Sequence, residues 1–220
     1  MPASGSKDSI SKEARAAARA PLSQDAIVRA VLDVGVNRFS MHSVARHLGV
    51  TATALYRHVG SRDELLALAM EAYCARIVLP DASLEWRPYL EALAHGFRDT
   101  LLAMPGAAEY GTKIGPATPS AFAIVDHAIG VLREAGFSAL GAWRAYSLVV
   151  NYAFSAVQGL EHFARLEAEH GSGGFRVFQL SAEERASFPN LAWTTDGIDF
   201  DFDATFDANL KAIVAGLEPG

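Results

Sequence analysis

The stretch SMHSVARHLGVTATALYRHVGSRDELL, which ends at Leu66, constrains the fold more than any other part of the chain. Its apolar residues recur at helical spacing on either side of a Gly-Val pair. Ser40 and Thr51 stand where helix N-caps are expected, and Gly49 can adopt the left-handed conformation that ends a helix. The pattern predicts two short helices that cross at a tight turn, over about 41–48 and 52–58. Such a pair is a helix-turn-helix.

The outward face of the second helix carries small, hydroxyl, aromatic and basic side chains. Ala52 and Thr53 are small enough to let the backbone approach base edges, and the positive end of the helix dipole attracts phosphate. Arg57 can reach a guanine or a phosphate, and Tyr56 can bind a phosphate or pack on a thymine methyl group. With the cap Thr51, these residues are candidate DNA contacts. The bare pattern is equally compatible with an ordinary helical hairpin.

Five groups of residues carry a family resemblance: Gly49-Val50, Leu55-Tyr56, His58-Val59, Arg62 and Leu65-Leu66. At this spacing they resemble the DNA-binding domain of the TetR family of transcriptional regulators. The resemblance implies a phosphate contact at His58, the end of the recognition helix, and a DNA contact at His42. A surface position without a role remains equally open for His42. Arg62, near the start of the following helix, is placed for a phosphate contact.

The distribution of charge predicts a DNA-binding head on a body that avoids DNA. The net charge of −6 alone argues against a nucleic-acid partner, but residues 1–79 carry +3 and residues 80–220 carry −9. There is no apolar run long enough to span a membrane, no signal peptide, and one cysteine, Cys74. We therefore expect a cytoplasmic protein without membrane contact and without an internal disulfide bond.

Apolar spacing and composition divide the all-α chain into three parts. Residues 1–22 are expected to be a flexible N-terminal arm, which either touches DNA or is a solvated tail. Residues 23–79 are expected to form the helix-turn-helix domain, whose last helix starts at the capping box Ser61–Glu64 and ends near Ile77. Residues 80–220 are expected to bind a ligand and to dimerise. Their helices are predicted at about 87–103, 119–135, 139–168 and 203–217, with a short one at Ala182–Ser187 in a mobile excursion over 169–200.

The predicted helix over 139–168 is apolar nearly all round, so it must be buried on more than one side. One side can face its own domain, and a partner subunit is the simplest cover for the other. Pairing with the final helix would place four helices across the two-fold axis of a homodimer. This half also resembles the tetracycline-repressor-like subgroup, at Trp86, Leu90, Phe97, Leu101-Leu102, Gly136-Phe137-Ser138, Phe200, Phe206, Leu210 and Gly216-Leu217-Glu218.

Aromatic and polar side chains mix on the helices expected over 87–103, 119–135 and 139–160. Nine of them are candidate ligand contacts: His95, Phe97, Phe122, Trp143, Tyr146, Asn151, Tyr152, Phe154 and Gln158. Such a lining suits a flat, largely apolar molecule. For any single residue, a place in the plain core is the more common reading. The family resemblance implies that a ligand cavity exists.

Tetracycline repressors hold a magnesium–drug complex through a histidine in the loop after the first pocket helix. The matching stretch here, Glu109–Lys113, has no histidine, and the acidic position of the long helix falls near Gln158–Gly159, two residues from Glu161. We therefore predict no tetracycline, no metal and no other cofactor. Glu161, His162 and Glu169 are poorly spaced for a metal site.

The sequence thus predicts a ligand-responsive transcriptional regulator, a repressor that binds a palindromic operator as a dimer and is released by a small effector. No spacing of residues indicates a catalytic site. Two alternatives remain. One is a constitutive or architectural DNA-binding protein without an effector, and the other is a helical enzyme with a DNA-binding head.

Overall fold

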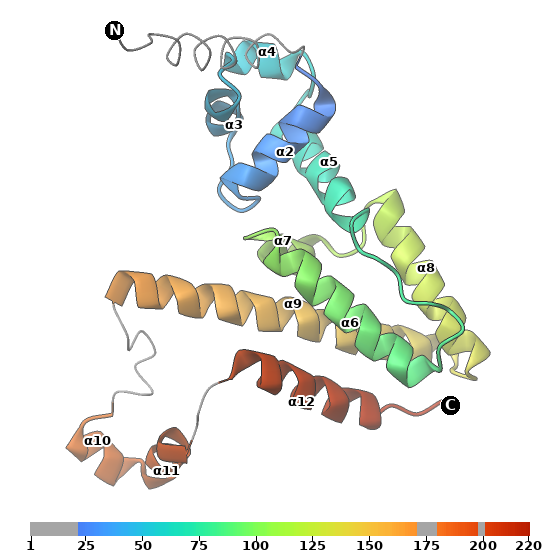
Figure 1. The fold of residues 1–220 in the computed structure, drawn as a ribbon, viewed down its shortest axis with the longest axis vertical. Coiled ribbons are helices and arrows are strands. Elements are labelled where there is room, and N and C mark those ends of the chain that lie inside the picture. The colour runs from blue at the N-terminus through green and yellow to red at the C-terminus, as the bar shows by residue number, and fades with distance from the viewer. Residues whose placement is uncertain (1–21, 171–179, 198–200) are drawn as a thin grey trace, which may run out of the picture.

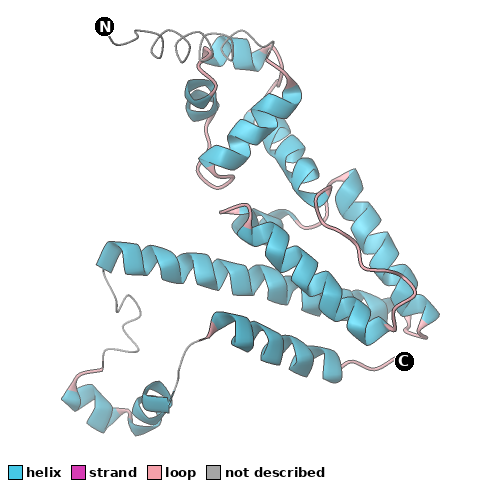
Figure 2. Cartoon of the chain, viewed as in Figure 1, coloured by secondary structure: helices cyan, strands magenta, loops and turns pink. Residues whose placement is uncertain are grey.

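The computed structural model describes residues 22–170, 180–197 and 201–220 (Figure 1). Every regular element within these ranges is a helix, which confirms the all-α class (Figure 2). Apart from Leu22, the predicted N-terminal arm lies outside the described residues, as do residues 171–179 and 198–200 of the predicted excursion.

The N-terminal part of the structure consists of four helices: α2 (Gln24–Val34), α3 (Met41–His47), α4 (Ala52–Tyr56) and α5 (Arg62–Cys74). Each begins after a residue whose hydroxyl accepts a hydrogen bond from the backbone amide three residues further on, and these caps are Ser23, Ser40, Thr51 and Ser61. α4 is two residues shorter than predicted. The amides of Arg57 and His58 bond to carbonyls three residues back, at 3.3 and 2.9 Å, so the chain tightens there into a turn.

The turn between α3 and α4 has the predicted geometry. Gly49 has a φ of +66°, and the Val50 amide donates to the Ala45 carbonyl at 2.9 Å, which closes α3. Leu55 on α4 is fully buried and Val59 is 1% exposed, so the two inward positions of the second helix are confirmed. α2, α3, α4 and α5 pack together as the helix-turn-helix head at the top of Figure 1.

α5 ends at Cys74 rather than near Ile77. Beyond Cys74 the amides of Arg76 and Ile77 bond three residues back, at 3.0 and 3.1 Å, and the helix gives way to turns before Pro80. Ile77 is nevertheless buried. The spacing of apolar residues that predicted a longer helix therefore reflects that Ile77 is buried, although its backbone is not helical.

The body contains five helices: α6 (Trp86–Leu102), α7 (Ala107–Ile114), α8 (Pro119–Glu134), α9 (Ala139–His170) and α12 (Phe202–Ala215). α9 is the central element, because α6, α7, α8 and α12 all pack against it. Figure 1 shows α6 and α12 running alongside it. Four of these helices were predicted to within two residues at each end. α7 was not predicted, because glycines are typical of loops and Gly106 and Gly115 stand at its two ends. Their φ angles are +86° and +65°.

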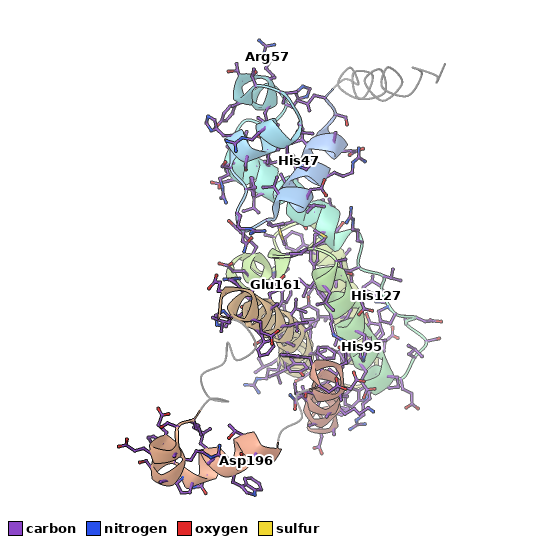
Figure 3. All side chains as sticks on the ribbon, turned by 60° about the vertical axis from the view of Figure 1, so that its left-hand side comes forward. His47, Arg57, His95, His127, Glu161 and Asp196 are labelled. Atoms are coloured by element: carbon purple, nitrogen blue, oxygen red, sulfur yellow. The ribbon has the colours of Figure 1, made fainter. Side chains whose placement is uncertain are left out.

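Two short helices, α10 (Ala182–Ser187) and α11 (Pro189–Gly197), pack against each other and stand away from the body (Figures 1 and 3). α10 matches its prediction, and α11 was missed. An ion pair between Arg185 and Asp196 joins the two helices. Phe188 and Trp193 are 56% and 79% exposed, so this pair presents aromatic surface to solvent.

One continuous apolar core extends from the head into the body. It includes Ile27 on α2, Leu65 and Tyr73 on α5, Leu90 on α6 and Phe206 on α12. α5 takes part at both of its ends, so the head and the body are not packed independently.

The outer side of α9 leaves large apolar side chains uncovered. Leu140 and Leu148 are 57% and 53% exposed, although α6, α7, α8 and α12 all pack against other parts of α9. This is the second apolar side that the sequence indicated. Within the described residues, no helix is both long and apolar enough to cross a membrane.

Two glycines with open space around them test the role of the turn. We expect Gly49→Ala to destabilise the protein by about 1–2 kcal/mol, because alanine is strained at positive φ. Gly130→Ala, within α8, is the matched control and should stabilise it by about 0.5–1 kcal/mol, because alanine favours helix. Urea denaturation measures both changes. Shifts of the same sign would contradict this account of the turn.

Candidate functional site

The outward face of the head is built by α4 and the start of α3. Thr53, Arg57 and His58 are exposed, Tyr56 is 50% exposed, and the side chain of Ala52 is partly exposed. Figure 3 shows Arg57 at the outer tip of the head, pointing away from the body.

Two further candidates are the N-cap of α4 and a residue of α3. The hydroxyl of Thr51 is occupied by the Ala54 amide at 3.1 Å, so this residue positions α4. His42 is exposed in the first turn of α3. Seven of the eight candidate DNA contacts are therefore at least partly exposed, on α3, on α4 and in the turns that flank α4.

Arg62 is placed differently from the phosphate contact that the sequence suggested. Its guanidinium lies over the ring of Phe39, 4.6 Å from the centroid, and donates to the Phe39 carbonyl at 3.4 Å. It also donates to the hydroxyl of Tyr110 at 2.9 Å. Because Tyr110 belongs to α7, Arg62 links the head to the body instead of facing outward.

A cavity of about 110 Å³ lies beneath the head. Its described walls come from the last turns of α5, the middle of α6, α7 with the following loop, the start of α8, and α9. Five of the nine candidate ligand contacts line it: Phe97, Trp143, Tyr146, Asn151 and Phe154. Its mixture of aromatic and polar side chains suits a flat, largely apolar molecule.

The other four candidates lie elsewhere. His95 faces α12, where it pairs with Asp207 at 3.5 Å and contacts the ring of Phe206. Tyr152 stacks on the same Phe206 ring and borders a separate hollow between α6, α9 and α12. Both were predicted to face the cavity because helical spacing does not show which neighbour a face meets.

Phe122 and Gln158 differ from expectation for local reasons. Phe122 is 57% exposed, because Ala121 and Ile124 form the inward stripe of α8 and Phe122 is one position off it. Gln158 donates to the Ala108 carbonyl at 2.8 Å and to the Thr112 hydroxyl at 3.0 Å. Its amide thus holds α7 against α9.

No ligand role was predicted for the side chains of α5. Met70, Tyr73 and Cys74, from its last two turns, all line the cavity. The sequence indicated only that these positions are apolar. The signal that could have found them is their place just before the turns that lead to Pro80, where the helix meets the body.

The titratable groups on the cavity wall are held in their neutral forms. Burial raises the pKa of Tyr73 well above its ordinary range, and it raises the pKa of Tyr146 to about 12. Burial also raises the pKa of the Cys74 thiol, and a hydrogen bond with Thr118 opposes this only in part. Cys74 is therefore a neutral thiol, which makes it a poor nucleophile.

α7 is clamped against α9 by polar contacts. Glu161 of α9 accepts a hydrogen bond from the Gly106 amide at 2.8 Å, at the start of α7. Figure 3 shows Glu161 on α9 beneath this helix. On the inner side, Gly111 lies so close to Phe154 that a methyl group there would overlap the ring. The position of α7 is therefore coupled to the wall of the cavity.

The outer side of α7 contacts the head. Glu109 accepts a hydrogen bond from the amide group of Asn37 at 3.3 Å, and Tyr110 accepts one from Arg62 at 2.9 Å. α7 thus touches the cavity on one side and the head on the other. The sequence did not indicate these roles, because the partners are up to 72 residues apart in the chain.

α5 is tied to α8 in a similar way. Glu71 accepts from the Ser120 amide at 3.0 Å and from the Ser120 hydroxyl at 2.6 Å. These bonds to Ser120 hold the pKa of Glu71 below its ordinary value of 4.5. Because Ser120 lies in the first turn of α8, the charge also complements the helix dipole.

The residues considered for a metal do not converge. Glu161 is engaged with α7, and the described residues contain no group of three His, Cys, Asp or Glu side chains placed to hold an ion.

Comparison with known families accounts for most of the chain. The family model described as bacterial regulatory proteins, tetR family, matches residues 25–69. The model described as tetracyclin repressor-like, C-terminal domain, matches residues 79–219. The chain belongs to the TetR family of transcriptional regulators. This family comprises DNA-binding regulators and not enzymes, and its C-terminal domains bind ligands.

Individual TetR-family relatives agree over nearly the whole length. An HTH-type transcriptional regulator of Saccharopolyspora erythraea is 32% identical over 201 residues, which cover 89% of this chain and 84% of the relative. The class A tetracycline repressor of Escherichia coli is 32% identical over 204 residues, with 89% and 90% covered. Among solved structures, the Streptomyces coelicolor TetR family protein ActR, in complex with actinorhodin, superposes with a TM-score of 0.71 at 26% identity, covering 90% of this chain and 96% of ActR.

The contact between α5 and α8 has a pH dependence whose sign follows from the pKa of Glu71. A carboxyl whose pKa is lowered by folding stabilises the protein above its unfolded pKa, and that contribution is lost as the pH falls through the folded pKa. We expect wild type to exceed Glu71→Gln in stability at pH 7 by at most about 1 kcal/mol, because solvent screens the site. The difference should shrink as the pH falls below 4.5 and vanish once the pH is below the lowered pKa of folded Glu71.

The partner variant Ser120→Ala separates the two bonds to Glu71. It removes the hydroxyl donor and leaves the amide donor. We expect the pKa of Glu71, measured by NMR titration, to rise toward 4.5 without reaching it. An unchanged pKa would mean that Ser120 does not hold the carboxylate.

Proposed function

We propose that this TetR-family regulator is a ligand-responsive repressor. Two heads of a homodimer bind a palindromic operator, and a small, largely apolar or aromatic effector in the cavity releases them. Residues 23–79 act as the DNA-binding domain and residues 80–220 as the ligand-binding and dimerisation domain. The observation that carries the proposal is that α5 and α7 each contribute to the cavity wall and to the contact with the head.

DNA contact is assigned to the outward face of the head. Arg57 and Tyr56 reach base edges or phosphates, Thr53 and Ala52 allow close approach, and His58 meets a phosphate. His42, from α3, reaches the flanking backbone. Arg62 is left out of this assignment, because its guanidinium is bonded to Phe39 and Tyr110.

A ligand in the cavity can change the head only if it prefers one arrangement of the helices. Gly111 and Phe154 face the cavity from α7 and α9, so a ligand between them would displace α7. The bonds from Asn37 to Glu109 and from Arg62 to Tyr110 would then move with it. A coupling of roughly 1–3 kcal/mol would change operator affinity about 5- to 150-fold.

Dimerisation is assigned to the outer sides of α9 and α12. Leu140 and Leu148 leave apolar area uncovered on α9, and a two-fold axis would bring the same face of a second copy against it. An architectural protein without an effector is the less favoured candidate. Such a protein needs no ligand cavity, whereas this body contains one with aromatic walls.

The proposal is tested by selecting operators from random DNA duplexes at stated salt, followed by a compound screen on the winning site. A palindromic winner that one class of compound releases supports an effector-controlled repressor. If no DNA sequence is enriched above non-specific binding, the proposal is wrong. A palindromic winner that no compound releases would favour the architectural alternative.

Substitutions in α4 test the reading face. We expect Tyr56→Ala and Arg57→Ala each to weaken binding to the selected operator by about 5- to 150-fold, the loss of roughly 1–3 kcal/mol. If Arg57 binds a phosphate, the dependence of affinity on salt should also fall by about one unit of slope. Arg76→Ala is the matched control, because it removes an exposed positive charge that lies two residues beyond the end of α5 and not on α4. Fluorescence anisotropy measures all three, and equal affinities would overturn the assignment of α4.

A charge on the outer face of α9 tests the dimer. We expect Leu148→Glu to raise the dimer dissociation constant at least tenfold, because an interface cannot bury an unpaired carboxylate without a large desolvation cost. Val78→Glu is the control, since Val78 is 80% exposed and lies outside α9 and α12. Sedimentation equilibrium measures both. A Leu148→Glu protein as dimeric as wild type would place the interface elsewhere.

A further inference from the structure

The hydroxyl of Tyr73 is closed off from solvent, and no described group lies within hydrogen-bond distance of it. Tyr73 is 1% exposed, and its side chain forms part of the cavity wall. A buried donor without an acceptor is costly, roughly 1–3 kcal/mol, and native proteins rarely keep one without a reason. Among the described residues this is the only buried side-chain polar atom left without a partner.

The surroundings make this hydroxyl a hydrogen-bond donor. Burial, with smaller effects from Cys74 and Tyr146, raises its pKa far above neutral pH, so the proton stays on the oxygen. The described side chains that line the cavity include no Asp, Glu, Lys, Arg or His. A ligand that enters therefore meets no described charge in the wall that could compensate one of its own.

From these two observations we infer that the effector is an uncharged aromatic compound with an oxygen acceptor, a carbonyl or an ether, which accepts a hydrogen bond from Tyr73. Tyr73 is then a polar anchor that orients the ligand, in a wall that also carries the uncharged polar residues Ser147 and Asn151. The inference deepens the proposed function and rests on it, because it names the ligand class for the same cavity.

Met70, like Tyr73, belongs to α5 and lines the cavity. It lies one turn before Tyr73 and is 8% exposed. Methionine is unbranched and repacks readily, so it can give way where a branched side chain would resist. Because both residues belong to α5, a ligand that displaces Met70 and bonds Tyr73 acts directly on the helix that begins at the head.

The test compares 9-fluorenone with fluorene, which share a ring skeleton and differ in one carbonyl group. We expect wild type to bind fluorenone about two- to tenfold more tightly, the worth of one net hydrogen bond, and Tyr73→Phe to bind both equally. Equilibrium dialysis without DNA gives the affinities. A charged analogue, fluorenone-4-carboxylate, should bind wild type at least tenfold more weakly than fluorenone.

A second readout does not need a ligand. Tyr73→Phe removes an unsatisfied hydroxyl, so its melting temperature should rise by about 2–4 °C. Tyr89→Phe is the matched control, because the Tyr89 hydroxyl is bonded to Nδ1 of His127 at 2.7 Å and lies outside the cavity wall. It should lower the melting temperature by a similar amount and keep the preference for fluorenone.

Several results would overturn the inference. They are a wild type without the preference, whether it binds both probes or neither, a preference that survives Tyr73→Phe, and a Tyr73→Phe protein as destabilised as Tyr89→Phe. Tight binding of the carboxylate would overturn the uncharged class. These outcomes are separable from the fate of the proposed function. Selective binding without release from the operator would refute only the repressor, and release by compounds that ignore Tyr73 would refute only the anchor.

Discussion

The continuous apolar core between head and body is the constraint on which the rest of the structure depends. α5 supplies buried side chains to the head at one end, such as Leu65, and to the cavity wall at the other, such as Tyr73. Packed interiors resist continuous deformation and tend to switch between discrete arrangements. A ligand that altered the packing around Tyr73 would therefore also disturb the packing of α5 that fixes the orientation of the head on the body.

Hydrogen bonds supplement the apolar core by fixing the position of α7 between the body and the head. Glu161 and Gln158 hold α7 on α9, whereas Asn37 and Arg62 join it to the head. Each bond is individually modest, about 0.5–1.5 kcal/mol for the neutral bond of Gln158 and about 1.5–3 kcal/mol for those that involve Glu161, Glu109 or Arg62. Their placement on opposite sides of one eight-residue helix matters more than their number, because a small rotation of α7 cannot keep both sets.

Much of this architecture could be predicted from the sequence, and what could not has an identifiable cause. The helices of the head could be predicted because their signals are local. Ser40 and Thr51 cap helices by bonding to amides three residues on, and Gly49 ends a helix at its own position. The long helices of the body were readable from apolar period alone. α7 was not, because its helix depends on bonds from α9, which is remote in the chain.

The candidate site residues show the same difference between local signals and contacts that are remote in the chain. Exposure of Arg57 and Tyr56 follows from the period of α4, and five aromatic or polar wall residues follow from the mixed face of α9 and α6. Arg62 and His95 were misplaced, since each has an alternative partner on another element, Tyr110 and Asp207. The cavity role of Tyr73 is invisible in the sequence, where a tyrosine on an apolar stripe looks like any other core residue.

The three tryptophans of the chain occupy three different surroundings, which gives the protein a set of built-in optical reporters. Trp143 stands in the cavity wall, Trp86 packs edge-on against Phe137 at 5.0 Å, and Trp193 is 79% exposed on α11. Occupancy of the cavity, integrity of the body and burial of α11 would each change the emission of a different indole. With two of the three replaced at a time, fluorescence can give the order in which those events occur.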